Sequence, residues 1–325
     1  MSTAIVIVNY RTPGLVIGCL NSLREEVAAL SGTRVFVGDA ASGDESVAAI
    51  SGYIEAEGLT WATCYGIGKN GGFAYGNNHI LQTHVLPDPS FTHVHFLNPD
   101  AYIHPGAVTA LRAHLDAIPG AGVAGSRLEN PDGTPRSYGF RDPKPWREFF
   151  RGARLGLLDR LVPRAAVKIE DLEITQEVDW VTGASFMMPR AVLEAVGLMD
   201  DGYFLYFEET DLMARVRKAG HSVWHVAESR VVHLAGQSTG VRTGAPGEAT
   251  EIRRLSPIWL RSRQRFFVKH YGKLCAGLGT LAFLTGDVFY RLHRVVLRRP
   301  VQDPPHLWRD YLKYGLRSSP PKDTE

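Results

Sequence analysis

Apolar and polar positions alternate along the first 120 residues as the strands and helices of an α/β protein require. Continuous apolar, β-branched runs predict buried strands at residues 4–8, 34–38, 60–65 and 93–97. Apolar residues at helical spacing predict helices at 15–30 and 105–118, and a helix to 81 after the Gly-rich run 70–77. Such alternation predicts a doubly wound, mostly parallel sheet.

The second half of the chain is less regular. Residues 131–174 are rich in Arg, Pro and Gly, with a helical patch around 146–161. Beyond them the pattern predicts strands at 179–188, 223–227 and 230–234, and a short helix at 189–197. The Gly-rich stretch 236–249 predicts a mobile loop that ends the main domain.

The stretch 202–220 joins an aromatic run to an acidic helix start. Glu208, Glu209 and Asp211 come where the helix should begin, and basic residues follow before Gly220. Amide groups and the helix dipole favour negative charge at such a start. The three acids could serve only to cap the helix, or one of them could be a catalytic carboxylate. The pattern leaves both interpretations open.

Polar residues also close three of the predicted strands. Asn9, Asp39 and Asp100 fall at strand ends, where ligands bind in open parallel sheets. Each of them is also a favoured turn residue, so none is decisive alone. Together, Asn98 and Asp100 offer oxygen ligands that suit a hard divalent cation such as Mg²⁺ or Mn²⁺.

Two further features suit a nucleotide ligand. Asp39 is an acceptor for a base imide or a ribose hydroxyl, and the run 70–78 offers backbone donors at a helix start, which suit a diphosphate or a sugar. No Gly-Lys-Ser/Thr follows, so this run is not the phosphate loop of nucleoside triphosphatases. His233, after an apolar strand, is either a core histidine or a metal ligand.

Composition describes an ordinary globular chain with an uneven charge distribution. The 325 residues are 44% hydrophobic and 22% charged, and the net charge is +2. Residues 253–325 carry +10 and residues 1–252 carry −8, so the tail is expected to meet an anionic partner. Three scattered cysteines and the lack of a signal-peptide pattern favour a reducing, cytoplasmic location.

The basic tail combines charge with apolar surface. A basic-aromatic helix is predicted at 259–271, and the run 274–290 is apolar except for Asp287. This run is at the short limit for a transmembrane span. It suits a helix in a membrane interface, or a core helix packed on the main domain, and both stay open. The tail shows no nucleic-acid reader motif, so we expect no nucleic-acid partner.

Six ordered motifs resemble family 2 glycosyltransferases, which are inverting enzymes of the GT-A fold, and most resemble their bacterial rhamnosyltransferase-like branch. The resemblance covers residues 5 to about 240. Its motifs are IVIVNYR (5–11), VGDAASGDES (37–46), NGGFAYGNN (70–78), FLNPDAYI (96–103), VTGASFMMPR (181–190) and GYFLYFEETDLMARVRKAG (202–220). It implies a GT-A domain at 1–240, with a nucleotide-sugar half at about 1–105 and an acceptor half at about 106–240, and a helical C-terminal region at 241–325.

The resemblance also implies residue roles. The nucleotide and donor sugar would be bound by Asn9, Tyr10, Arg11, Asp39, Asn70, Gly71, Gly72, Phe73, Asn77, Asn98 and Gly183. A divalent cation, Mg²⁺ or Mn²⁺, would be bound by Asp100 and His233. Glu209 would be the catalytic base, Glu208 would support it, and Asp211 would act in positioning, with Arg215 one helical turn away.

Three positions depart from the family pattern. Asn98 replaces the first acid of the Asp-x-Asp motif, Glu209 replaces an Asp as base, and Ala40 replaces an Asn after Asp39. The metal shell is therefore weaker in charge, and the base is one methylene longer.

The implied reaction transfers a sugar, with rhamnose from dTDP-rhamnose expected, to a hydroxyl of a saccharide or lipid-linked saccharide in cell-surface polysaccharide synthesis. A family 2 transferase that uses a UDP-hexose, and a non-catalytic nucleotide-sugar binding protein, are the alternatives. The implied location is cytoplasmic, or peripheral at the inner face of the plasma membrane through residues 259–299. The sequence leaves a homodimer open.

Overall fold

The computed structural model describes residues 2–136, 139–154, 173–234 and 254–316, which form two units. Unit 1 comprises Met1–Phe140, Ile169–Asp201 and Glu208–Thr243. Unit 2 comprises Arg141–Lys168, Gly202–Phe207 and Gly244–Glu325. The predicted loop at 236–249 and the last part of the predicted helical patch at 146–161 lie outside the described residues.

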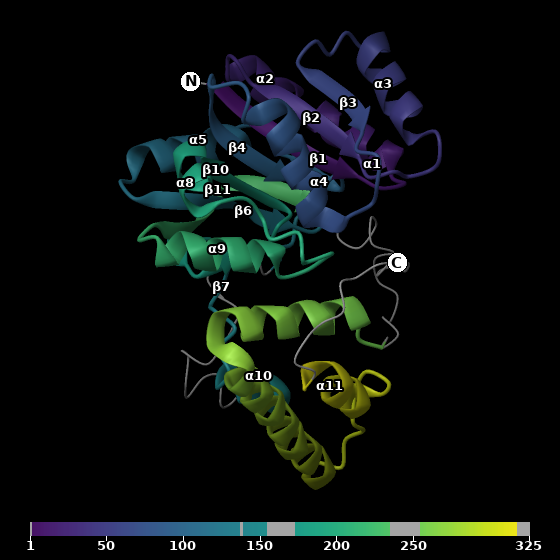
Figure 1. Cartoon of the computed structure of the whole chain (residues 1–325), viewed down its shortest axis with the longest axis vertical. Coiled ribbons are helices and arrows are strands. Elements are labelled where there is room, and N and C mark those ends of the chain that lie inside the picture. The colour runs from purple at the N-terminus through teal and green to yellow at the C-terminus, as the bar shows by residue number, and fades with distance from the viewer. Residues whose placement is uncertain (1, 137–138, 155–172, 235–253, 317–325) are drawn as a thin grey trace. The chain divides into compact units, whose positions relative to one another are not determined.

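Unit 1 is built on a nine-stranded sheet (Figure 1), with the strand order β3-β2-β1-β4-β10-β6-β11-β5 and β8 paired to β11. The strands are β1 (Ser2–Asn9), β2 (Arg34–Asp39), β3 (Ala62–Gly66), β4 (Phe91–Leu97), β5 (Ala101–Ile103), β6 (Ala121–Glu129), β8 (Gln176–Val178), β10 (Ser185–Pro189) and β11 (Ser222–His233). β7 (Gly139–Phe140) and β9 (Trp180–Val181) form a separate antiparallel pair.

Most of the sheet is parallel, as the sequence predicted. β1 pairs in parallel with β2 and β4, β2 with β3, and β6 with β11. β10 is antiparallel to both β4 and β6 and so joins the two parallel groups. The carboxyl ends of β1, β2 and β4 therefore meet at one edge.

Helices cover both faces of this sheet, and each face has its own apolar core. Ile5 and Ile7 of β1 face the core that is formed with α1 (Pro13–Ser22), α3 (Ser46–Ala56) and α5 (Ala107–Ala117). Val6 faces the core that is formed with α4 (Gly72–Ile80), the π-helix η1 (Leu81–Val85), α8 (Arg190–Val196) and α9 (Glu208–Lys218). Alternate side chains of one buried strand thus reach opposite faces.

Several boundaries differ from the sequence predictions. The helix predicted at 15–30 is broken at Leu23 into α1 and α2 (Arg24–Ala29). The strand predicted at 179–188 is split, because β9 pairs with β7 whereas β10 pairs with β4. The two strands predicted at 223–227 and 230–234 form one strand, β11, whose register to β6 shifts between Val226 and Arg230.

Unit 2 consists of helices, namely α6 (Arg147–Ala153), α10 (Pro257–Val296) and α11 (Leu307–Gly315) in its described residues (Figure 1). α10 is kinked at Gly272, whose φ of 81° is left-handed, so its two arms match the basic-aromatic and apolar segments predicted at 259–271 and 274–290. The core includes Phe283, which stacks on Tyr311 at a ring-centroid distance of 4.0 Å.

A buried ion-pair network links the helices of unit 2. Arg263 is 1% exposed and contacts the carboxylate of Glu148 at 2.6 Å, and Arg151 contacts the same carboxylate at 2.6 Å. Arg151 also donates a hydrogen bond to the Tyr311 hydroxyl at 2.6 Å. Loss of one partner would leave a buried charge incompletely paired, and the network connects α6, α10 and α11. In the described part of the chain, none of the helices is both long and apolar enough to cross a membrane.

Candidate active site

The ends of β1 and β2 carry a closed hydrogen-bond cluster. Asn9 and Asp39 are register partners, and Asn9 Nδ2 donates to Asp39 Oδ2 at 2.7 Å. Ser42 donates to the same carboxylate from its backbone N (2.9 Å) and its hydroxyl (2.5 Å). Asn9 and Asp39 are buried, with 0% and 3% exposure. The cluster therefore fixes the turn that follows β2 at the carboxyl edge of the sheet.

Tyr10 and Arg11 extend this cluster towards the surface. Arg11 has a left-handed φ of 58°, and its backbone N donates to the Ser42 hydroxyl at 2.8 Å. Its Nε donates to the Ser42 carbonyl at 2.9 Å, and its Cζ lies 5.1 Å from the Tyr10 ring centroid. Arg11 and Tyr10 thus form an ordered cation–π pair beside the Asn9–Asp39 cluster.

The Gly-rich motif forms the start of α4. Asn70 Oδ1 accepts a hydrogen bond from the Gly72 N at 3.1 Å, and Gly72 has a left-handed φ of 86° that favours glycine. Asn77 Nδ2 donates to the Phe73 carbonyl at 2.9 Å within the helix. A Cβ on Gly71 would overlap the Tyr75 ring, with Cδ1 at 2.6 Å, so glycine is the residue that fits there. The motif is thus fixed by its own side chains and glycines.

Asn98, Asp100 and His233 form a cluster that we call the cation corner. His233 is the register partner of Ala101, so β11 brings it beside the turn after β4. Its Nε2 lies 3.3 Å from Asp100 Oδ1 and 3.4 Å from Asn98 Nδ2. The structure thus brings together three residues separated by up to 135 positions in the sequence.

The cation corner fits a divalent cation. Asp100 is 1% exposed, yet neither of its carboxylate oxygens accepts a hydrogen bond. A buried carboxylate without donors is costly, and a cation compensates it. The described residues contain no group of three or more His, Cys, Asp or Glu side chains that could hold a metal ion, so other ligands would have to come from substrate or water. Burial and the Asp100 carboxylate raise the pKa of the nearby Cys19 thiol.

Glu208 and Glu209 open α9, as predicted. Glu208 is 4% exposed, Glu209 is half-buried, and one carboxylate oxygen of each, Oε2, is buried without a hydrogen-bond partner. The two residues before them, Tyr206 and Phe207, have left-handed φ values of 71° and 70°, which are strained for aromatic side chains. Strain next to unpaired buried carboxylates is typical of a functional site.

Gly183 lies between the start of α9 and the Gly-rich motif. A Cβ placed on Gly183 would lie 3.5 Å from the Phe73 ring and 3.8 Å from Glu209 Cβ. Three predicted site residues from separate parts of unit 1 are therefore neighbours. Even an alanine would fill the space between Phe73 and Glu209.

Burial perturbs both glutamates. It raises the pKa of Glu209 to about 7, although backbone amides of Glu209 and Thr210 partly offset this effect. Burial also raises the pKa of Glu208 well above its usual value, and the Glu209 charge raises it further. One of the two acids therefore changes protonation near neutral pH, as a general base requires.

Asp211 is fully buried and forms the ion pair with Arg215 that the helical spacing predicted, with Nε to Oδ2 at 3.0 Å. The same guanidinium donates to the carbonyls of Val196, Gly197 and Leu198 at 2.5–3.1 Å. Asp211 therefore orients an arginine that ties α9 to the end of α8, which fits a positioning role.

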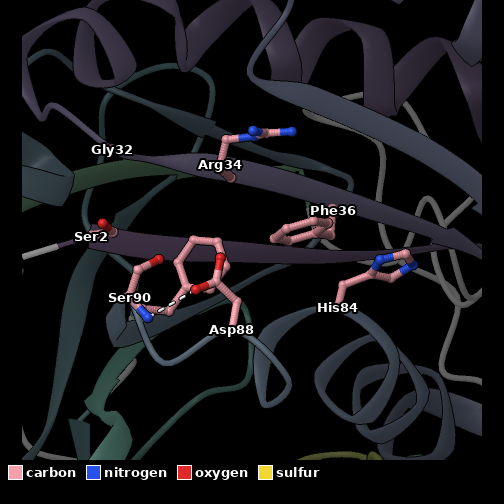
Figure 2. A pocket seen from close by; sticks show the side chains of 8 residues that line it. Ser2, Gly32, Arg34, Phe36, His84, Asp88 and Ser90 are labelled. Carbon is pink, nitrogen blue, oxygen red and sulfur yellow. Dashed lines mark hydrogen bonds between the residues drawn. The ribbon is translucent and has the colours of Figure 1, made fainter.

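A cavity of about 420 Å³ lies at the opposite edge of the sheet, at the amino ends of β1, β2 and β4 (Figure 2). Ser2, Arg34 and Phe91 line it, together with His84, which stacks on Phe36 at 5.3 Å. None of the predicted site residues lines this cavity, so it is distinct from the candidate site.

Two residues near the candidate site were not predicted. Ser42 closes the Asp39 cluster, and its position three residues after an Asp is a turn signal that the sequence does show. Arg136 Nη1 donates to the His233 carbonyl at 3.2 Å, but its segment has no pattern that could have revealed this contact.

Comparison with known proteins supports a glycosyltransferase-like chain. No family model matches. Over 148 residues the chain is 32% identical to N-acetylglucosaminyl-diphospho-decaprenol L-rhamnosyltransferase of Mycobacterium tuberculosis. The aligned segment covers 44% of this chain and 47% of the relative. Over 203 residues it is 24% identical to the low-salt glycan biosynthesis hexosyltransferase Agl10 of Haloferax volcanii, and this alignment covers 62% of this chain and 58% of that relative. The chain thus spans about half the length of the curated relatives it matches.

Solved structures identify the fold. The mannosyltransferase PcManGT of Pyrobaculum calidifontis, in complex with GDP-Man and Mn²⁺, superposes with a TM-score of 0.55 at 14% identity and covers 92% of this chain and 76% of its own. S. aureus TarS 1-349, in complex with UDP-GlcNAc, superposes with a TM-score of 0.51 at 14% identity and covers 96% and 80%. The chain has the GT-A fold, and its predicted resemblance to rhamnosyltransferase-like glycosyltransferases is confirmed.

Proposed function

We propose that the protein is an inverting, metal-dependent glycosyltransferase that moves rhamnose from dTDP-rhamnose to a hydroxyl of a lipid-linked saccharide. Its place would be in cell-surface polysaccharide synthesis. The observation that carries the proposal is Glu209, a carboxylate with a raised pKa of about 7 that adjoins Gly183 and Phe73.

In this proposal Glu209 accepts the proton of the acceptor hydroxyl, whose oxygen attacks the anomeric carbon of the donor sugar. The nucleoside diphosphate leaves from the opposite face, and the configuration inverts. Burial and the Glu209 charge raise the pKa of Glu208, which disfavours a second negative charge beside the base. The lack of a side chain at Gly183 leaves Phe73 and Glu209 uncovered on this side, where the reacting sugars would lie.

The donor nucleotide is assigned to the carboxyl edge of β1, β2 and β4. The Asn9–Asp39 cluster and the Arg11–Tyr10 pair would bind the base and ribose, and the start of α4 would line the sugar. Asp100 and His233 would hold Mg²⁺ or Mn²⁺, which when bound neutralises charge on the leaving diphosphate. The Asp100 carboxylate oxygens, which accept no hydrogen bond, support this assignment, and so does the Mn²⁺ in the PcManGT complex.

The rhamnose donor and the lipid-linked acceptor rest on the mycobacterial relative, whose name specifies both the sugar and a diphospho-decaprenol acceptor. A peripheral position at the inner face of the plasma membrane belongs to the same proposal, because such an acceptor is anchored in lipid. A UDP-hexose donor is the second candidate, since the Haloferax relative is named a hexosyltransferase and TarS was solved with UDP-GlcNAc.

A donor panel separates the candidates. The full chain is incubated with Mn²⁺, a diphospho-lipid GlcNAc acceptor, and dTDP-rhamnose, UDP-glucose, UDP-galactose, UDP-GlcNAc or GDP-mannose in turn. We expect acceptor-dependent release of dTDP from dTDP-rhamnose alone. Release from a UDP-sugar instead would replace the rhamnose assignment. No acceptor-dependent release from any donor, with donor still bound, would favour the non-catalytic binding protein.

A further inference from the structure

The second arm of α10 carries an apolar stripe on its exposed face, interrupted by the exposed Thr285 between Leu281 and Val288. Its residues follow one side of the helix and are 38–79% exposed; they are Leu274, Leu278, Leu281, Val288, Phe289, Leu292, Val295 and Val296. A helical arm from 273 to 296 is about 35 Å long. Exposed apolar surface of this extent on a protein marks a contact with a partner or a membrane.

The packing of α6 on α10 fixes the direction of this stripe. A Cβ on Gly152 would overlap the Phe283 carbonyl oxygen, and a Cβ on Gly286 would overlap the Phe149 carbonyl oxygen. The two backbones therefore touch where the helices cross. Since Phe283 also stacks on Tyr311, the opposite side of the arm is occupied, and rotation that buried the stripe would break these contacts.

Exposed charge around the stripe is positive. Between residues 273 and 316 the acids are Asp287, Asp303 and Asp310, whose side chains are at most 9% exposed. Each of them is paired with an arginine. The basic residues of the same segment are Lys273, Arg291, Arg294, Arg298, Arg299, Arg309 and Lys313. An anionic surface complements this charge.

A basic cavity of about 400 Å³ adjoins the stripe-bearing arm. Arg291 and Arg309 line it, together with His306 and Trp308. The Trp308 indole N–H donates to Asp287 Oδ2 at 2.7 Å, so this amphipathic ring is anchored at one end while it stays 37% exposed. Tryptophan beside arginine is typical of the headgroup level of a bilayer.

We propose that the second arm of α10 lies in the plane of an anionic membrane. Its apolar stripe then lies among the acyl chains, and its basic residues and the cavity at Trp308 lie at the level of the lipid phosphates. This assignment deepens the proposal of a lipid-linked acceptor, but the geometry of unit 2 alone defines it. A second copy of the chain fits less well, because a symmetric contact through the stripe would bring the basic residues of both copies together.

The test is co-sedimentation of the full chain with vesicles of phosphatidylcholine alone or mixed with phosphatidylglycerol. We expect binding to the mixed vesicles that weakens as salt rises. In the triple variant L278Q/L281Q/L292Q, whose exposed positions leave the fold intact, partitioning should fall on the order of a hundredfold. The control variant Ile174→Gln, which replaces a 56% exposed residue outside the stripe, should bind like the wild type. Equal binding by the triple variant, or none by the wild type, would overturn the proposal.

Two further measurements separate the alternatives. A wild-type dimer in analytical ultracentrifugation that the triple variant loses, without vesicle binding by either, would assign the stripe to a second copy and overturn the membrane assignment. Donor turnover on a short-chain, water-soluble acceptor should be unchanged in the triple variant. Vesicle binding by a wild type that shows no donor turnover would support the membrane-binding surface and refute the glycosyltransferase proposal. The two proposals can therefore fail separately.

Discussion

Glu209→Gln tests the centre of the proposed site. Gln has nearly the shape of a protonated Glu, so the α9 start and the neighbourhood of Gly183 should persist. The change removes only the ability to accept a proton. Its matched control is Glu208→Gln, because burial and the Glu209 charge raise the pKa of the neighbouring acid and so favour its protonated form, which Gln imitates.

The expected magnitude follows from the role and the pKa. General-base catalysis contributes about 10²- to 10⁴-fold, so kcat should fall by that factor in Glu209→Gln. In the wild type, kcat/KM should rise with pH and level off above a pKa of about 7. At pH 5 only about 1% of such a carboxylate is ionised, so the rate should be about fiftyfold below its value at pH 7. The Glu208→Gln control should keep this acid limb, because burial is the main cause of the raised pKa of Glu209.

The assay measures initial rates of nucleoside diphosphate release from pH 5 to pH 9, and calorimetry measures donor affinity. Both glutamine variants should bind donor like the wild type. The reasoning is refuted if Glu209→Gln turns over within about threefold of the wild type. It is also refuted if the acid limb disappears in Glu208→Gln and remains in Glu209→Gln, since the base would then be the other acid.

The remaining predictions concern stability and metal binding. As the pH rises from 5 to 9, the Glu208→Gln variant should lose less thermal stability than the wild type. The reason is that a carboxylate whose pKa is raised in the folded state stabilises the fold below its unfolded pKa of 4.5 and loses this contribution as the pH rises. Melting temperatures from scanning fluorimetry at each pH check this. Asp100→Asn should abolish the rise in melting temperature that Mn²⁺ and a nucleoside diphosphate cause together, and an unchanged rise would remove Asp100 from the metal site. Arg263→Met leaves the buried Glu148 with one arginine partner, so the free energy of unfolding measured by urea titration should fall by about 3 kcal/mol. A loss below about 0.5 kcal/mol would show that the fold does not need the Arg263–Glu148 pair.

Where local pattern and tertiary environment agreed, the sequence predicted the fold well. β1, β2 and β4 are buried on both faces, so their apolar runs were unambiguous, and the positions of Asn9, Asp39 and Asp100 at one edge follow from parallel pairing. β6 was missed because its sequence AGVAGSRLE has little strand propensity, and its place between β10 and β11 supplies the pairing.

The candidate site shows the same division. The acids at the start of α9 and the Asp-Arg pair on that helix were predicted from spacing alone, because helical neighbours are fixed by periodicity. The approach of Gly183 to Phe73 and Glu209 joins three distant segments, and no local pattern encodes such a contact. The residue type and strand pattern left His233 open between core and ligand, and only the pairing of β11 with β5 places its Nε2 3.3 Å from Asp100 Oδ1.

The sequence by itself determined the α/β class, the acidic start of α9 and the basic, apolar character of the second arm of α10, because each depends on residue type and period. Only the tertiary structure decided which carboxylates are buried without a hydrogen-bond partner and which apolar surface stays exposed to solvent. The raised pKa of Glu209 arises from burial in the folded chain, where Gly183 adjoins it. The outward direction of the apolar stripe arises because Gly152 and Gly286 let α6 occupy the opposite side of α10.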